Sequence, residues 1–307
     1  MRRKLQGENK QMFAITGITG QVGGEVARNL LAAHQTVRGV VRDVSKAKAW
    51  AERGCEVVAA DMNDPAALAA AFEGAEGVFV LVPPNFDPSP DFQEARAIAD
   101  TLARALGSAR PGRVVHLSTV GAQATHLNLL SQHTIIEQAL GKLSVPITFL
   151  RPGWFMENSR WDVASARNGL IQSFLQPLDK PVAMVATADV GYLAAELLQE
   201  KSQGHRVVEL EGPRRVTPNE IAASFAKLLG RPVRVEAVPR ETWGSLFKSQ
   251  GMNNPEPRIQ MIDGFNEGWI RFEGNDDGVR KGKVELETVL RSLIELEGGV
   301  KARSTTT

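Results

Sequence analysis

The chain has 307 residues, of which 43% are hydrophobic and 23% are charged, the composition of an ordinary globular protein. Its 36 Lys and Arg residues are balanced by 35 Asp and Glu residues. That balance argues against a nucleic-acid partner and against an anionic membrane surface. No apolar stretch of the sequence approaches the ~20 residues that a membrane-spanning helix needs. A single cysteine, Cys55, excludes an internal disulfide and favours a reducing, cytoplasmic location.

Strands and helices are expected to alternate through the first half of the chain. Short apolar runs with little polar alternation predict buried strands at 12–16, 36–41, 55–60, 77–82, 113–118 and 146–150. The segments between them predict helices at 21–33, 44–53, 65–73, 91–106 and 127–141. This alternation predicts an α/β fold with a Rossmann-type doubly wound parallel sheet.

The second half is expected to form a smaller C-terminal α+β lobe, because four of the five tryptophans lie there and the apolar spacing becomes irregular. One later strand, near 206–211, is expected to return to the sheet. Thr217 and Glu220 have the spacing of a capping box that begins a helix. The predicted division is a flexible arm (1–11), an NAD(P)-binding Rossmann domain (12–152), mainly a substrate or cap lobe (153–300) and a disordered tail (301–307).

Three glycines spaced three apart follow the first predicted strand. Gly17 permits a tight turn, Gly20 leaves room for a pyrophosphate against the backbone, and Gly23 lets the next helix pack close to the strand. The N–H groups and the positive dipole end of that helix would face an anion in the turn. Glycine-rich turns are common, but a strand before, a helix after and a second strand about 20 residues on predict nucleotide binding.

The end of the second predicted strand favours NADP(H) and makes NAD(H) the weaker candidate. An acidic residue at this point binds the ribose of NAD, whereas an arginine accommodates the 2′-phosphate of NADP. Arg42 is the first polar residue after the strand, and Lys46 follows closely. Arg42 could instead be a solvated surface charge, and Asp43 opposes NADP unless it caps the next helix. Asp61, after the third strand, is either an acceptor for the adenine amino group or a plain loop residue.

The catalytic pair of short-chain dehydrogenases, Tyr-x-x-x-Lys, is missing. Its lysine lowers the pKa of the tyrosine, but here the single tyrosine, Tyr192, is followed four residues on by Glu196. In the helix where the motif should fall, His133 stands at the lysine position. His133 could bind a nicotinamide ribose or shuttle a proton, or it could lie inert on the helix surface. Ser118, at the end of the fifth strand, could contact cofactor or substrate, or cap its neighbour.

Other chemistries are not supported by the sequence. There is no Gly-x-Ser-x-Gly motif, which a serine hydrolase of the α/β type would need. The five histidines and the single cysteine have no metal-ligand spacing, so no metal is expected.

Four segments together resemble the NmrA-like family of atypical short-chain dehydrogenases. They are residues 16–23 (TGITGQVG), 40–43 (VVRD), 60–62 (ADM) and 150–158 (LRPGWFMEN). The resemblance extends over about residues 12–290. It implies a Rossmann domain with strand order 3-2-1-4-5-6-7, a small C-terminal lobe that forms a cleft, and binding of NADP(H) or NAD(H).

The resemblance also implies the residues that hold the cofactor. Those around the pyrophosphate belong to the glycine turn: Gly17, Thr19, Gly20, Gln21, Val22 and Gly23. The others follow later strands: Arg42 and Lys46 at the adenosine phosphate, Asp61 and Met62 beside the adenine, Val82 and Pro83 on its far side, and Phe155 near the nicotinamide. His133 departs from the lysine of many members, which leaves cofactor binding intact.

Two functions follow from these residues. A hydride can pass from NADPH to a quinone while water or His133 protonates the product, so the missing tyrosine does not prevent quinone reduction. The favoured function is therefore an NADPH-dependent reductase for a quinone or similar small electrophilic carbonyl compound, bound in a cleft between the lobes. The alternative is a non-catalytic NADP(H)-binding redox sensor that regulates a protein partner.

Overall fold

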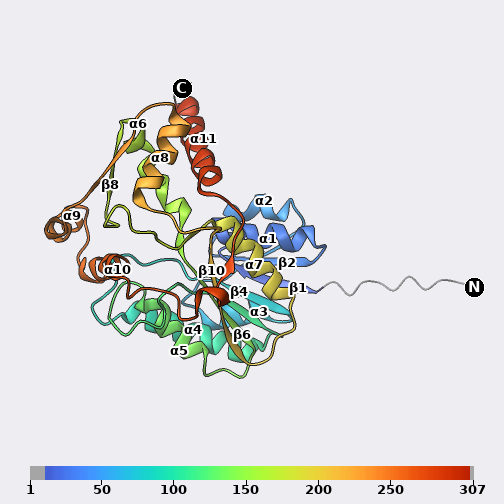
Figure 1. The fold of residues 1–307 in the computed structure, drawn as a ribbon. Coiled ribbons are helices and arrows are strands. Elements are labelled where there is room, and N and C mark those ends of the chain that lie inside the picture. Colours follow the sequence, from blue (N-terminus) through green and yellow to red (C-terminus); the bar gives the residue numbers. More distant parts are fainter. Residues whose placement is uncertain (1–10, 305–307) are drawn as a thin grey trace, which may run out of the picture.

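A computed structural model describes residues 11–304, without the side chains of 276 and 299–304 (Figure 1). Nearly all of the predicted arm (1–11) and the last three residues of the predicted tail lie outside the described residues. Helix α11 (Leu286–Ser304) continues to Ser304, so the first four residues of the predicted tail, 301–304, are helical.

An eight-stranded parallel sheet forms the centre of the molecule. Its strands are β1 (Met12–Thr16), β2 (Thr36–Val41), β3 (Glu56–Ala59), β4 (Gly77–Val80), β5 (Val114–Leu117), β6 (Ile147–Pro152), β10 (His205–Glu211) and β12 (Arg280–Lys281). Their order is β3-β2-β1-β4-β5-β6-β10-β12. This confirms the expected order, with β10 as the returning seventh strand. The edge strand β12 was missed, because a two-residue strand has no periodicity to detect.

Helices cover both faces of the sheet, as the short apolar strands predicted (Figure 1). On one face, α1 (Gln21–Ala32) and α7 (Thr187–Gln199) pack with strand residues such as Phe13 and Ile15. On the other, α3 (Pro65–Phe72), α4 (Gln93–Ala109) and α5 (Ser131–Leu140) pack with residues such as Val78 and Val80. Successive strand residues face opposite sides, so each strand contributes to both cores.

Two predicted helices differ most from the observed ones, while the others agree to within three residues at each end. The segment 44–53 contains a 3₁₀ turn, η1 (Val44–Ala47), followed by the short helix α2 (Lys48–Ala51). Helix α5 begins at Ser131 instead of 127. The side chain of Asn128 accepts a hydrogen bond from Leu130 N at 2.8 Å, and such side-chain bonds compete with helix formation.

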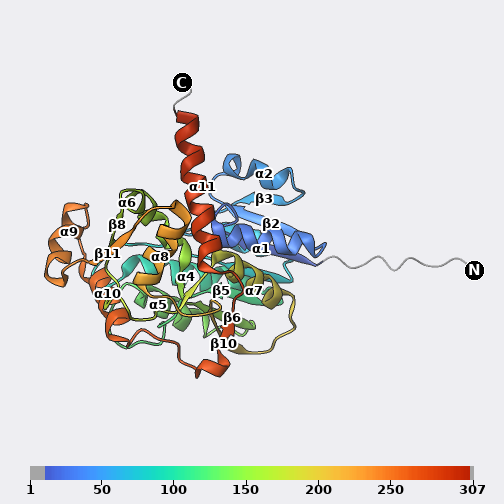
Figure 2. The ribbon, with the colours of Figure 1, turned by 45° about the horizontal axis from the view of Figure 1, so that its top comes forward.

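The C-terminal half forms a second core with the aromatic residues that the sequence concentrates there. Its helices are α6 (Val163–Arg167), α8 (Pro218–Leu229), α9 (Trp243–Ser249), α10 (Glu256–Glu267) and α11, with 3₁₀ turns η2 (Met156–Asp162), η3 (Arg240–Thr242) and η4 (Asp276–Gly278). Two small parallel sheets pair β8 (Leu170–Ser173) with β11 (Arg234–Ala237), and β7 (Trp154–Phe155) with β9 (Met184–Val185). The predicted capping box is present at the start of α8. Figure 2 shows α11 extending outward toward the C-terminus.

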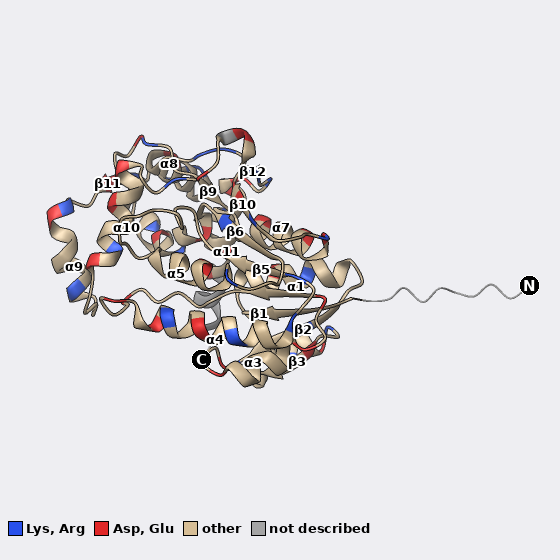
Figure 3. Cartoon of the chain, turned by 90° about the horizontal axis from the view of Figure 1, so that it is seen from below, with Lys and Arg blue, Asp and Glu red and all other residues tan. Residues whose placement is uncertain are grey.

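Charged residues of both signs are interspersed along the helices and loops (Figure 3). No helix within residues 11–304 is both long and apolar enough to cross a membrane. Cys55 is buried, and this burial raises the pKa of its thiol.

Candidate functional site

The parallel sheet brings the predicted site residues to one edge. All eight strands run in the same direction, and in such sheets ligands bind beyond the carboxyl ends of the strands. The glycine turn follows β1, Arg42 follows β2, Asp61 follows β3, Val82 follows β4 and Ser118 follows β5.

The glycine turn after β1 leaves the start of α1 open. Gly17 has φ +66°, and a Cβ on Gly23 would lie 2.3 Å from Gly17 O, so the helix can only approach this closely with glycine at 23. Gly20 is the N-cap and offers no side-chain cap. Thr19 and Gln21 beside it are exposed, whereas Val22 is buried. The first N–H groups of α1 therefore lack a side-chain acceptor, which suits an anion.

Arg42 and Asp43 differ in their partners. Asp43 caps η1: its Oδ1 accepts hydrogen bonds from Ser45 N at 3.0 Å and from Ser45 Oγ at 2.7 Å. These bonds lower the pKa of the Asp43 carboxyl. Arg42 and Lys46 are exposed, and the side chain of neither has a hydrogen bond or ion pair with any residue in the range 11–304. The acid that would favour NAD is thus engaged locally, while the guanidinium is free.

The remaining predicted cofactor residues flank the later strand ends. Asp61 is exposed, and its Oδ1 accepts from Asn63 N and Asn63 Nδ2, both at 2.9 Å. Met62 and Val82 are half-buried against the core that contains α3 and α4, and Pro83 is exposed. Phe155 is half-buried against the core on the opposite face of the sheet, the one with α1 and α7.

Ser118 is buried and bonds to Glu137, which also binds Arg151; the sequence did not single out either residue. Its hydroxyl donates to Glu137 Oε1 at 2.5 Å. Arg151, at the end of β6, donates to the same carboxylate from Nε at 2.9 Å and from Nη2 at 2.6 Å. Although burial alone would lower it, the bonds to Glu137 raise the pKa of Arg151. The contact of Ser118 with cofactor or substrate stays a prediction, and its hydroxyl donates its hydrogen to Glu137.

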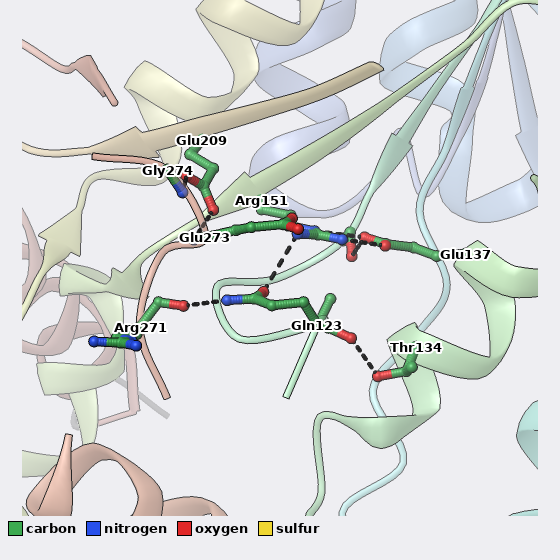
Figure 4. A network of polar contacts seen from close by, with 10 residues as sticks. Gln123, Thr134, Glu137, Arg151, Glu209, Arg271, Glu273 and Gly274 are labelled. Atoms are coloured by element: carbon green, nitrogen blue, oxygen red, sulfur yellow. Dashed lines mark hydrogen bonds and ion pairs between the residues drawn. The ribbon is translucent and has the colours of Figure 1, made fainter. Parts of the chain in front are cut away.

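The same arginine joins the sheet to the C-terminal half (Figure 4). Its Nη1 donates to Glu273 Oε2 at 2.7 Å and to Gln123 Oε1 at 3.3 Å. Gln123 in turn donates to Arg271 O at 2.7 Å. The N–H of Glu273 donates to Glu209 Oε1, also at 2.7 Å. One buried guanidinium thus holds the ends of β5 and β6 against the segment 271–274.

His133 lies on α5 with its ring 6.1 Å from that of His116. Burial lowers the pKa of His133 to about 4, against an opposing effect of Glu137, and its Nδ1 has no partner among the described residues. Burial, with His133 nearby, lowers the pKa of His116 to about 3. Both imidazoles are therefore neutral at pH 7. At this pH the imidazole of His133 can accept a proton or a hydrogen bond, but it is not protonated and so cannot serve as a general acid.

Tyr192 lies on α7, exposed, and donates to Glu196 at 2.9 Å. Within residues 11–304, groups of three or more His, Cys, Asp or Glu that could hold a metal are absent.

Sequence reasoning missed Arg151, Glu137 and Glu273. Arg151 lies inside the motif 150–158, and its charge in an otherwise apolar strand was the available signal. Glu137 and Glu273 carried none, because ordinary surface helices and loops contain many glutamates.

The fold is that of a Rossmann-type α/β protein, and no side chain caps the first helix after the glycine turn. The sequence matches the NmrA-like family over residues 9–268, and the chain belongs to that family. Quinone oxidoreductase 2 of Escherichia coli (strain K12) is 30% identical over 256 residues, which cover 82% of this chain and 85% of that protein. The NAD(P)H azoreductase of Xenophilus azovorans is 28% identical over 257 residues, covering 83% and 85%.

Solved structures show the same fold. An Escherichia coli NADPH-dependent quinone oxidoreductase complexed with NADPH has a TM-score of 0.76 and 25% identity, covering 93% of this chain and 99% of that chain. The triphenylmethane reductase of Citrobacter sp. has a TM-score of 0.77 and 23% identity, with the same coverage.

Proposed function

We propose that this protein is an NADPH-dependent reductase that transfers a hydride to a quinone or a similar small electrophilic compound. The choice of cofactor rests on two neighbouring residues after β2. The carboxylate of Asp43 accepts hydrogen bonds from Ser45, whereas the side chain of Arg42 has no partner within residues 11–304. A free guanidinium can bind the 2′-phosphate that distinguishes NADPH from NADH. The names of the relatives, a quinone oxidoreductase and an azoreductase, support a reductase of electron-poor compounds.

The residues of the first turn and of β2 would hold the cofactor. The open N–H groups of α1 would bind the pyrophosphate, with Thr19 and Gln21 beside them, and Arg42 with Lys46 would bind the adenosine phosphate. Asp61 and Met62 would flank the adenine, with Val82 and Pro83 on its far side. Phe155 would lie near the nicotinamide. Bound NADPH supplies the hydride.

The proton for the product would come from water. Ser118 directs its hydrogen to Glu137, and the low pKa of His133 keeps that imidazole neutral at pH 7. The reduced quinone is a phenolate, which water can protonate, so no strong acid is required of the protein. Oxidation of an alcohol would need a strong base, which favours the reductive direction.

Calorimetry with the Arg42→Ala variant tests the cofactor assignment. We expect the dissociation constant for NADPH to rise about 30-fold and that for NADH to stay within about two-fold, since only NADPH carries the 2′-phosphate. Lys142→Ala, at an exposed position after α5, is the charge-matched control. Equal losses for both cofactors would contradict the assignment of Arg42.

Anaerobic turnover of NADPH with 1,4-benzoquinone tests the reaction. Oxidation of NADPH that depends on both quinone and protein is expected. If NADPH binds but no quinone, azo compound or other carbonyl compound is reduced, the reductase is excluded. A preference of ten-fold or more for one redox state of the cofactor would then support the sensor.

A further inference from the structure

One half-buried glutamate fixes the segment that follows β6. Glu157, in the first turn of η2, accepts from Thr187 N at 2.9 Å through Oε1 and at 3.0 Å through Oε2, and from Thr187 Oγ1 at 2.7 Å. Thr187 is the first residue of α7, and the N-cap residue Ala186 has no side-chain cap. Burial raises the pKa of Glu157, although the bonds from Thr187 oppose this. The cap of α7 therefore comes from a residue 30 positions away.

Phe155 lies between two contacts that fix β7 against β9. On one side Trp154 N donates to Ala183 O at 2.9 Å, and on the other the carboxylate of Glu157 binds the start of α7. Phe155 itself is paired with Val185. Each strand contributes only two residues, and so short a pair is weak without other contacts. The carboxylate therefore helps to set where Phe155 lies beyond the carboxyl end of β6.

Helix α7 also packs against α1, the helix of the glycine turn (Figure 1). A Cβ on Gly191 of α7 would lie 3.1 Å from Val22 O, so the two helices are in close contact. Val22 belongs to the first turn of α1, whose N–H groups face the proposed pyrophosphate site. Helix α7 is thus fixed to α1 on one side and, through Glu157, to the segment of Phe155 on the other. The separation of the two ends of the proposed cofactor site depends on this helix.

Resting on the proposed function, we propose that Glu157 is a positioning residue for hydride transfer, which holds Phe155 where the nicotinamide ring of NADPH would lie. Its carboxylate touches neither cofactor nor substrate, because both of its oxygens are bonded to Thr187. The proposed phosphate contacts are made by other residues, Arg42 and the first turn of α1. Loss of the carboxylate should therefore change the placement of the nicotinamide and leave most of the affinity for the cofactor in place.

The proposal predicts an effect on the rate of hydride transfer and not on cofactor affinity. A misplacement of about 1 Å at the reacting atoms can cost about 100-fold in rate. Because Phe155 keeps its pairing and its core packing in Glu157→Ala, we expect a smaller loss of about ten-fold. The dissociation constant for NADPH should stay within about three-fold. Glu157→Gln keeps an oxygen that accepts from Thr187, so its rate should recover to within about three-fold of the wild type.

The rate is measured by stopped flow, as the loss of NADPH absorbance after the preformed protein–NADPH complex is mixed anaerobically with saturating 1,4-benzoquinone. Calorimetry gives the affinity. The fluorescence of bound NADPH, recorded without quinone, reports the surroundings of the nicotinamide, and in Glu157→Ala we expect it to shift toward that of free NADPH.

Glu220→Ala is the matched control. Glu220 also serves a helix start, because it accepts from Thr217 N at 2.7 Å in the capping box of α8. Both variants should lower the temperature of thermal unfolding, since each removes a helix cap. Only Glu157→Ala should change the rate of hydride transfer and the fluorescence of bound NADPH.

An unchanged rate in Glu157→Ala overturns the positioning role. An equal loss of rate in Glu220→Ala overturns it too, because lowered stability would then explain both. If Glu157→Ala does not fold, Thr187→Val decides: it removes the hydroxyl bond and keeps the backbone N–H, so the rate should fall about three-fold, and an unchanged rate overturns the role. If the wild type binds NADPH but reduces no quinone, the proposed function fails. The placement of the nicotinamide by Glu157 is then decided by fluorescence alone, and an unchanged emission in Glu157→Ala overturns it.

Discussion

Two regions of the sheet edge differ in how their polar groups are used. Around the first turn and β2, Thr19, Gln21 and Arg42 are exposed, and Arg42 has no partner within the described range. Around β5 and β6, Ser118 and Arg151 both donate hydrogen bonds to the carboxylate of Glu137. Figure 4 shows Arg151 directed at Glu137. The exposed side chains of the first region are available to a ligand. In the second region, here called the closed joint, the side chains around Arg151 bond to one another and connect the two halves of the molecule. Polar groups close to a site therefore need not belong to its chemistry.

The largest effect should come from breaking the closed joint. Arg151→Met leaves the buried Glu137 without its bidentate partner, and loss of one member of a buried ion pair costs about 3–5 kcal/mol. Urea unfolding measures this change. Arg104→Ala, which removes the exposed pair with Asp100, is the control and should cost less than about 1 kcal/mol. A loss below 1 kcal/mol for Arg151→Met would show that the joint does not stabilise the fold.

A second effect concerns His116, a buried histidine of β5. The unfolded chain protonates His116 below about pH 6.5, but the native protein does so only near pH 3, so stability is lost as the pH falls through this window. At pH 5 this amounts to about 2 kcal/mol.

The variant His116→Leu tests this dependence. We expect its free energy of unfolding to fall by about 2 kcal/mol less than that of the wild type between pH 7 and pH 5. His205→Gln, at an exposed position of β10, should follow the wild type. Parallel curves for His116→Leu and the wild type would mean that His116 is not the titrating group.

In the open region around the first turn, a substitution is expected to change cofactor affinity more than stability. Thr19→Ala removes an exposed hydroxyl without a partner among residues 11–304, so the free energy of unfolding should change by less than about 0.5 kcal/mol. The affinity for NADPH should fall about five-fold, or about 1 kcal/mol, if the hydroxyl binds the pyrophosphate. Urea unfolding and calorimetry on the same sample separate the two effects, and unchanged affinity would remove Thr19 from the site.

A weak effect is also expected at Glu273, the exposed end of the ion-pair network around Arg151. Glu273 is 59% exposed at its side chain, so Glu273→Gln should cost less than about 1 kcal/mol despite its 2.7 Å contact with Arg151. Comparing this variant with Arg151→Met, by urea unfolding, shows how far burial and not distance sets the strength of an ion pair. A loss of several kcal/mol would contradict that view.

Seven strands of the sheet and the turn after β1 could be predicted because their signals are local, whereas the order of the strands was implied by the resemblance to the family. Apolar runs indicate buried strands, and three glycines between a strand and a helix indicate a phosphate turn. Boundaries were less accurate where side chains of loop residues compete with the helix, as Asn128 does before α5. The proton position on Ser118 and the neutral state of His133 depend on Glu137, on Arg151 and on burial, none of which has a local pattern.

By itself, the sequence determined the class of fold, the glycine turn and the order in which Arg42 and Asp43 follow β2. Each of these follows from residues close together in the chain, where periodicity and spacing carry the information. Only the tertiary structure decided that Asp43 is engaged and Arg42 free, that Arg151 joins β6 to Glu137 and Glu273, and that Asp87 reaches the loop before α10. These contacts join residues that are up to 167 positions apart, and the partner of a side chain at such a separation depends on packing and burial.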